Sequence, residues 1–238
     1  MEKRTGRPAV RRIINSTASP GEHEKFMNSE NIIIEPPVKG EWAIFNPPGH
    51  PKLAFDLLAV DKNKSPYKKG GLLRHLVSFI SVENTYTWSA PVYSPVKGEV
   101  VEVGNTAKDR LSLCMSYDLF RLMANKPALK EGFSAFGGNY VVIRNGNFHV
   151  LLCHMKEGSV CVQVGEEVET GQKLGEVGNS GSSIQPHLHV QVMKSKDIFP
   201  LFGNLVPFKV TKGQRKTGKD ITEVKEFSLV NGEHYLFS

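Results

Sequence analysis

Residues 162–193 read VQVGEEVETGQKLGEVGNSGSSIQPHLHVQVM, and this stretch decides the fold. Valines and leucines recur between polar residues, and glycines interrupt the pattern every few positions. Short alternating runs are typical of β-strands, and glycine accepts the positive φ angles of tight turns. The stretch therefore predicts short strands at 165–168, 173–177 and 188–193, joined by turns.

The same rhythm continues upstream, with further strands expected at 31–36, 41–46, 53–60, 99–103, 140–144 and 149–154. Residues 94–103 (SPVKGEVVEV) echo the turn-and-strand pattern of 162–177. Such an echo is found in the barrel-sandwich hybrid, a fold shared by lipoyl carriers, phosphotransferase components and one metallopeptidase family. We predict a mainly β, antiparallel fold of this barrel-sandwich or duplicated hybrid motif type, with short helical insertions.

Changes in composition suggest how the chain is divided. Residues 1–30 are polar and without periodicity, which predicts a flexible N-terminal extension. Residues 31–205 form the main domain, with insertions near 61–87 and 106–137 that we expect to border a cleft and set specificity. Residues 206–238 are expected to form an appended β-hairpin around the turn Asn231-Gly232, between strands at 226–230 and 234–237.

The overall composition excludes several classes of protein. The 238 residues are 39% hydrophobic, enough for a sizeable core, and no apolar run reaches the roughly 18 residues of a membrane span. The basic N-terminus has no apolar segment behind it, so it does not resemble a signal peptide. The net charge of +6 suits an anionic partner or is ordinary solubility charge. Because the basic residues are not interleaved with aromatic ones, we expect no nucleic-acid groove.

His187 and His189 are the first candidates for chemistry. They flank Leu188 in a predicted strand, where side chains two apart share one face. Two imidazoles on one face form the start of a zinc site, although a His-x-His pair alone also arises by chance. The preceding small-residue loop, 178–183, is expected to keep bulk away from whatever approaches the pair.

A zinc site with three protein ligands needs more than this pair. Asp56 interrupts an apolar strand, where a buried carboxylate is costly unless it is paired or binds metal. The alternative is a solvent-facing acid. His50 stands six positions upstream of Asp56, and His154 ends an apolar strand, where a lone histidine is more often a core residue. His75 is the rival of His50, and Asp61 is the rival of Asp56.

The three cysteines, Cys114, Cys153 and Cys161, have no CxxC spacing, and their odd number argues against a complete disulfide framework. Cys153 precedes His154 in its predicted strand. Alternation would therefore turn Cys153 to the opposite face from His154, and we interpret it as a buried structural thiol.

These motifs together resemble the lysostaphin-like zinc endopeptidases, many of which cut peptidoglycan cross-bridges. The resemblance rests on GNYVVIRNGNFHVLLCHM, on the VxxGxxVxxGQxLGxVGxSG block, on the PHLH motif and on the upstream APVYSPVKGEVVEVGN. It covers roughly residues 49–193 apart from the two insertions. One departure is the upstream motif, because its histidine and aspartate are commonly four apart in the family and six apart here.

The resemblance implies one zinc ion per chain, held by His50, Asp56 and His189, with His154 and His187 as the catalytic pair. It also implies a peptide substrate in bacterial peptidoglycan and a place in the cell envelope or outside the cell. The oligomeric state stays open. The alternative function is a catalytically inactive module of the same fold that binds cell wall or activates a hydrolase. A phosphotransferase-type or lipoyl carrier is a poorer fit, since neither needs His-x-His beside an acid.

Overall fold

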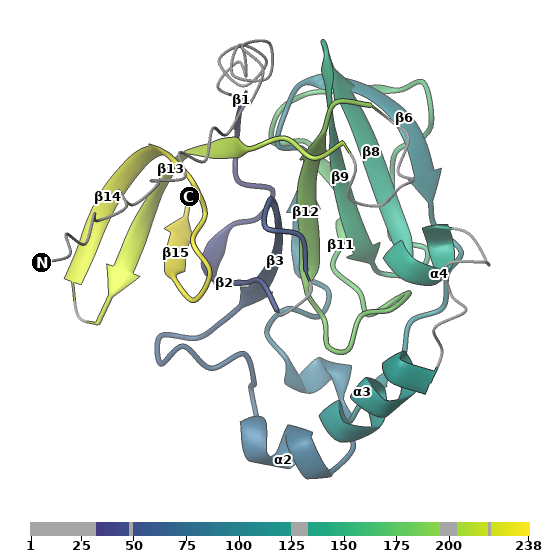
Figure 1. Ribbon diagram of the computed structural model, residues 1–238, viewed down its shortest axis with the longest axis vertical. Coiled ribbons are helices and arrows are strands. Elements are labelled where there is room, and N and C mark those ends of the chain that lie inside the picture. The colour runs from purple at the N-terminus through teal and green to yellow at the C-terminus, as the bar shows by residue number, and fades with distance from the viewer. Residues whose placement is uncertain (1–31, 48–49, 125–132, 196–203, 219) are drawn as a thin grey trace, which may run out of the picture. The chain divides into compact units, whose positions relative to one another are not determined.

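The computed structural model of the chain describes residues 32–47, 50–124, 133–195, 204–218 and 220–238. These residues belong to one compact unit, 31–238, so the predicted N-terminal extension, 1–30, lies outside the described residues. The expected mainly β architecture is confirmed (Figure 1). The described strands are β1 (Ile32–Ile34), β2 (Gly40–Phe45), β3 (Ala54–Ala59), β4 (Ile80–Ser81), β5 (Pro91–Tyr93), β6 (Gly98–Gly104), β7 (Ser112–Leu113), β8 (Asn139–Asn145), β9 (Phe148–Met155), β10 (Glu167–Val168), β11 (Lys173–Glu176), β12 (Leu188–Met193), β13 (Phe208–Thr217), β14 (Asp220–Phe227) and β15 (His234–Phe237).

Most of these strands join one large sheet in the order β1-β13-β15-β2-β3-β12-β9-β8-β6-β10. β14 belongs to the same sheet and pairs with β13 outside this order. The pairs are antiparallel except β1 with β13. β12 lies between β3 and β9, and all residues of β3 and β12 are buried. Burial on both faces explains why their sequences are almost continuously apolar, and why the few polar residues in them need partners.

The core lies on one face of this sheet. Leu188, Val190 and Val192 of β12 pack there against residues from most of the other strands. On the opposite face, a smaller apolar cluster includes Leu151, Cys153 and Met193. Because alternate residues of β12 point to opposite faces, His189 and Gln191 share the face of Met193.

The two segments that echo each other in sequence pair with each other in space. β10 pairs with β6, and β11 pairs with β5, both antiparallel. The pairing of β6 with β10 joins the two segments at the end of the large sheet, whereas β5 and β11 form a separate two-stranded sheet.

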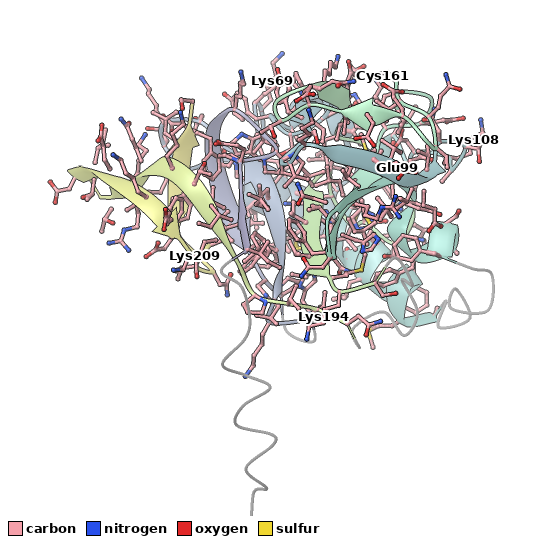
Figure 2. The ribbon with its side chains drawn as sticks, turned by 90° about the horizontal axis from the view of Figure 1, so that it is seen from above. Lys69, Glu99, Lys108, Cys161, Lys194 and Lys209 are labelled. Carbon is pink, nitrogen blue, oxygen red and sulfur yellow. The ribbon has the colours of Figure 1, made fainter. Side chains whose placement is uncertain are left out.

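The helices of the described residues lie in the two predicted insertions. They are α2 (Leu72–Val77) and the 3-10 turn η1 (Val82–Asn84) in the first, and α3 (Met115–Ala124) and α4 (Phe133–Gly137) in the second. The insertions also pair through β4 and β7, and α2 contacts α3. None of the described helices is long and apolar enough to cross a bilayer. Basic side chains such as Lys69, Lys108, Lys194 and Lys209 project outward from separate parts of the chain (Figure 2).

The C-terminal residues form a different hairpin from the predicted one. The Asn231-Gly232 turn forms, but the strands on its two sides do not pair, because β13 lies between β14 and β15. β15 also pairs with β2, so the C-terminal strands extend the main sheet. A turn motif predicts where the chain reverses, but it does not determine which strand the following residues pair with. Here β15, after the turn, pairs with the edge of β2.

Candidate metal centre

Asp56 and His189 face each other across two central strands. They are register partners between β3 and β12, and the Asp56 Oδ1 atom lies 3.0 Å from the His189 Nδ1 atom. Direct cross-strand partners share a face of the sheet. Both side chains are buried. The apolar strand that carries Asp56 therefore leads the carboxylate to an imidazole and not to solvent.

His50 reaches the same point from the loop before β3. Its Nε2 atom lies 3.2 Å from Asp56 Oδ1 and 3.1 Å from His189 Nδ1. Asn46 holds this loop, because its side-chain amide donates hydrogen bonds to the carbonyl oxygens of Pro51 and Ala54. The six-residue spacing is thus accommodated by a folded loop. We call His50, Asp56 and His189 the ligand cluster.

The N–H groups of His50 and His189 form hydrogen bonds with residues outside the ligand cluster. The His50 Nδ1 atom donates to the Pro51 carbonyl oxygen at 3.2 Å. The Gln191 amide donates to Met193 Sδ, so its Oε1 atom accepts from His189 Nε2 at 3.0 Å. These partners assign the tautomers. His50 Nε2, Asp56 Oδ1 and His189 Nδ1 are then left facing one another with lone pairs.

Three lone-pair atoms at such short separations need a positive charge among them. Burial alone would lower the pKa of His50 and raise that of Asp56. Their mutual interaction outweighs burial, so the pKa of His50 is raised, while the neighbouring histidines hold the pKa of Asp56 well below its usual value. A proton or a metal ion supplies this charge. Two imidazoles and one carboxylate, all within 4.8 Å of one another, could hold a metal ion.

His154 enters the site through a bulge at the end of β9. Between β8 and β9 the register shifts, so that Met155 pairs with Asn139 and Cys153 with Tyr140, leaving His154 as the extra residue. The backbone of His154 has a φ of 61°, in the left-handed region that non-glycine residues rarely adopt. Its ring lies 6.1 Å from that of His189, and its Nδ1 atom donates to the Ser180 carbonyl oxygen at 3.0 Å.

This bulge corrects the prediction for Cys153. The thiol is buried and free, as expected, and burial raises its pKa well above the usual value. However, Cys153 is the register partner of His189, so it lies on the face of the ligand cluster. Simple alternation placed Cys153 and His154 on opposite faces. The left-handed residue breaks that alternation and brings both to the same side.

His187 lies beside His154, just before β12. The two ring centroids are 4.5 Å apart, and His187 Nε2 is 3.5 Å from Asp56 Oδ1. The His187 Nδ1 atom donates to the carbonyl oxygen of Gln185 at 2.9 Å. Burial lowers the pKa of His187, and burial together with the neighbouring histidines lowers the pKa of His154 well below its usual value. Both rings are therefore neutral near pH 7, and each leaves its Nε2 atom able to accept a proton.

The small residues of the loop 178–183 serve close packing behind the site. A Cβ atom on Gly138 would lie 2.2 Å from Ser180 Oγ, and one on Gly181 would lie 2.4 Å from the Gly138 nitrogen. The Ser180 hydroxyl also joins this loop to β8 and β9, because it accepts from Asn139 N and donates to the Met155 carbonyl oxygen. Small size is thus needed to seat Ser180, whose carbonyl orients His154.

The two insertions hold the segment that carries His187. Arg110 donates to the carbonyl oxygens of Gly181 and Ser183, and Tyr67 Oη donates to Gln185 Oε1 at 3.3 Å. The Ser183 hydroxyl in turn donates to the Gln185 carbonyl, the same oxygen that orients His187. Sequence reasoning missed these residues and Gln191. Only Gln191 carried a signal, because it lies two positions after His189 on the same strand.

The rival candidates lie elsewhere. His75 is buried in the insertions, where its Nδ1 atom lies 2.6 Å from Tyr67 Oη. Asp61 accepts hydrogen bonds from the backbone of Asn63 and Ser65 and closes a turn. Neither belongs to the ligand cluster.

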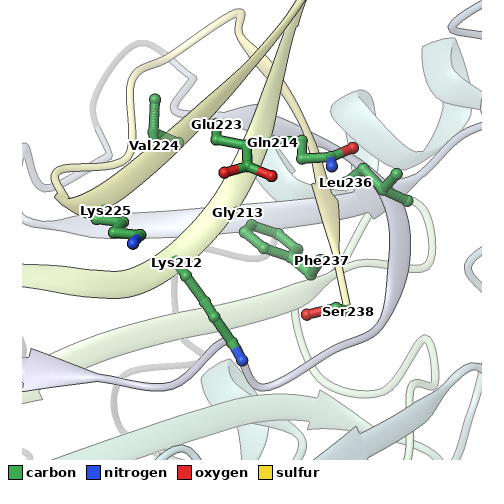
Figure 3. Close-up of a pocket in the computed structure, with 9 residues that line it drawn as sticks. All are labelled: Lys212, Gly213, Gln214, Glu223, Val224, Lys225, Leu236, Phe237 and Ser238. Atoms are coloured by element: carbon green, nitrogen blue, oxygen red, sulfur yellow. The ribbon is translucent and has the colours of Figure 1, made fainter.

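A hollow of about 410 Å³ lies on β13 to β15 (Figure 3). It is lined by Lys212, Gly213, Gln214, Glu223, Val224, Lys225, Leu236, Phe237 and Ser238. It shares no residue with the ligand cluster or with His154 and His187. We therefore assign the candidate site to the ligand cluster and not to this hollow.

Fold and site together define a class: a β-sheet protein with a His-Asp-His donor set, of which Asp56 and His189 are buried and His50 is half-buried, and two further histidines beside it. A model of peptidase family M23 matches residues 81–201, just over half of the chain. The chain therefore belongs to peptidase family M23. The matched region contains His154, His187 and His189, whereas His50 and Asp56 precede it and join the site only in the folded chain.

Curated relatives cover part of the chain. Peptidoglycan DD-endopeptidase ShyC of Vibrio cholerae serotype O1 is 35% identical over 105 residues, 44% of this chain and 22% of the relative. Peptidoglycan DD-endopeptidase ShyA of the same organism is 28% identical over 92 residues, 38% of this chain and 21% of the relative. The chain thus spans about a fifth of the length of these relatives.

Solved structures of family members were matched at low similarity. The catalytic domain of lysostaphin from Staphylococcus simulans is 18% identical, with a TM-score of 0.36 and coverage of 68% of this chain and 91% of that domain. A putative M23 peptidase from Pseudomonas aeruginosa is 20% identical, with a TM-score of 0.39 and coverage of 68% and 46%.

Proposed function

We propose that the chain is a zinc-dependent endopeptidase that hydrolyses a peptide bond of bacterial peptidoglycan. In this proposal His50, Asp56 and His189 hold one zinc ion, and His154 and His187 are the catalytic residues. The observation that carries it is the convergence of three lone-pair atoms within 3.2 Å of one another, with no proton assigned between them. Membership of a peptidase family and the two endopeptidase relatives support the class of reaction.

The donor set suits zinc better than a hard cation. Zinc favours imidazole nitrogen and carboxylate oxygen in four-coordinate sites, and a catalytic site keeps one position open. When bound, the ion supplies a Lewis acid that polarises a carbonyl and makes water more acidic. Magnesium and calcium prefer oxygen ligands only, so they fit two imidazoles poorly.

The second pair of histidines supplies proton transfer. Each donates from Nδ1 to a backbone carbonyl oxygen, Ser180 for His154 and Gln185 for His187, so each ring carries its lone pair on Nε2. The Nε2 atom of His187 lies 3.5 Å from Asp56 Oδ1. A neutral imidazole in this position takes a proton from the attacking water and afterwards donates it to the leaving amine. General base catalysis of this kind contributes about 10²–10⁴ in rate.

The test combines metal analysis with digestion of purified peptidoglycan. We expect one zinc ion per chain, release of peptide fragments, loss of release with a chelator, and recovery when zinc is restored. The His187→Ala variant should keep its zinc and lose about 10²–10⁴ in kcat. A protein without zinc, or a His187→Ala variant with full activity and bound zinc, would contradict the proposal. The first result would favour an inactive cell-wall-binding module.

A further inference from the structure

Helices α2 and α3 of the two insertions present large apolar side chains to solvent. The two helices contact each other and lie side by side in Figure 1, and the rings of Phe79, just after α2, and Tyr117 of α3 lie 5.6 Å apart, so we treat their exposed apolar side chains as one surface. We call it the α2–α3 face. Its members are Leu72, Leu73, Leu76, Val77, Phe79, Tyr117, Leu119, Phe120 and Met123. Leu73 is 75% exposed, Val77 72% and Phe120 70%.

These helices bury polar side chains and expose apolar ones, the reverse of an ordinary surface helix. The buried residue of α2 is His75, and α3 buries Asp118. Asp118 receives hydrogen bonds from Arg110 and from the backbone nitrogen of Cys114. His75 and Asp118 are thus held against the protein, and the apolar side chains of the two helices are left facing solvent. A contiguous apolar surface of this kind marks a place of contact with another molecule.

The charge around the α2–α3 face indicates what that molecule is. Residues 62–82 contain five basic residues and no acidic one. Three of them, Lys68, Lys69 and Arg74, are exposed beside or within α2, and Lys69 points away from the protein in Figure 2. Leucine, valine and phenylalanine side chains rimmed by lysine and arginine are complementary to the boundary between acyl chains and anionic headgroups.

We propose that the α2–α3 face binds the surface of an anionic lipid bilayer and attaches the protein peripherally to it. The apolar side chains enter the headgroup boundary, while Lys68, Lys69 and Arg74 contact the anionic headgroups. A symmetric pairing of two copies through this face fits less well, because it would bring the basic residues of one copy against those of the other. The inference goes beyond the proposed hydrolysis and does not depend on it.

Co-sedimentation with lipid vesicles tests the proposal. The full chain should bind vesicles that contain phosphatidylglycerol and bind pure phosphatidylcholine vesicles at least about tenfold more weakly. The triple variant Leu73→Ser, Val77→Ser, Phe120→Ser should lower binding about tenfold or more, because three side chains no longer leave water. The control variant Val164→Ser, Ile221→Ser removes two side chains that are 63% and 57% exposed outside this face, and it should bind as the parent does.

A second arm separates charge from apolar contact. Replacement of Lys68, Lys69 and Arg74 by glutamine should also weaken binding to anionic vesicles about tenfold, and 0.5 M salt should have a similar effect on the parent. Equal binding by the parent and the apolar triple variant would overturn the proposal, as would failure of the parent to bind phosphatidylglycerol vesicles. A concentration-dependent dimer that the apolar variant abolishes, without vesicle binding, would assign the face to a second copy instead.

Discussion

Two regions of this chain reverse the usual distribution of polar and apolar side chains, and they do so in opposite directions. In the ligand cluster, Asp56 and His189 are each 6% exposed and lie in the middle of an apolar sheet. On the α2–α3 face, Leu73 and Phe120 are at least 70% exposed on the surface of two helices. Both arrangements raise the free energy of the folded chain relative to an ordinary core and an ordinary surface.

The difference lies in where the compensation comes from. Around the ligand cluster, the chain itself supplies it: Pro51, Gln191, Ser180 and Gln185 accept the imidazole protons, and a single positive charge completes the set. On the α2–α3 face, the chain fixes the polar side inward and leaves the apolar side to water. The first region is therefore stabilised from within the chain together with one positive charge, whereas the apolar side chains of the second have no such partner within the described residues.

The largest effect is expected from a change that disturbs the packing of the loop 178–183, which carries the Ser180 carbonyl. Gly138→Ala places a Cβ atom 2.2 Å from Ser180 Oγ at a φ of 66°. We expect the free energy of unfolding to fall by about 2–4 kcal/mol, since overpacking adds to the cost of a left-handed alanine. Denaturant unfolding measures it.

The matched control is Gly146→Ala. Its φ is 54°, but nothing lies within 4 Å of the added Cβ atom. It should cost only about 1 kcal/mol, the left-handed conformation alone. Equal losses in the two variants would mean that close contact behind Ser180 does not hold the loop.

The next largest effect is expected at Gln191. Its Oε1 atom accepts from His189 Nε2, which leaves Nδ1 as the bare atom of the ligand cluster. Replacing a residue that orients a metal-ligating histidine typically costs 10–100-fold in metal affinity. Gln191→Leu should therefore lower zinc affinity by about that factor in a competition titration with a chelating dye. Gln191→Glu keeps an acceptor at the same distance and should retain most of the affinity. Unchanged affinity in Gln191→Leu would show that the tautomer of His189 is fixed by other means.

Local pattern predicted the central strands and singled out three of the five candidate site residues, whereas the roles of His50 and His154 came from the family resemblance. Period-two alternation placed His187 and His189 on one face, and an acid within an apolar run singled out Asp56. What it did not predict depends on contacts between distant segments. The bulge that turns His154 has no local signal, and Arg110 acts on the loop 181–183 across some seventy residues. The partner of β15 was likewise decided by a free strand edge and not by the Asn231-Gly232 turn.

A smaller effect is expected from pH at the inner, polar side of the insertions. His75 is fully buried, its Nε2 atom has no hydrogen-bond partner among the described residues, and burial lowers its pKa from 6.5. Below pH 6.5 the unfolded chain takes up a proton that the folded chain resists, so stability falls as the pH drops towards the lowered pKa. The loss is at most about 1.4 kcal/mol per pH unit.

The His75→Gln variant removes this titration and sharpens the measurement. Urea unfolding between pH 7 and pH 5 gives the free energy of unfolding of each protein. As the pH falls, this free energy should decrease more for the parent than for the variant. The other histidines titrate in both proteins and cancel from the difference. If the difference in the free energy of unfolding between the two proteins did not change with pH, His75 would accept a proton as readily in the folded chain as in the unfolded chain.

The smallest effect is expected on the α2–α3 face in the absence of lipid. Phe120 is 70% exposed, so in the isolated protein its ring gains little from folding. Phe120→Gln should change the free energy of unfolding by no more than about 0.5 kcal/mol, as is usual for a surface position. Denaturant unfolding of the parent and the variant measures this. A loss of several kcal/mol would show that the ring packs against the chain itself, and the contrast with the ligand cluster would then disappear, because both regions would be compensated from within.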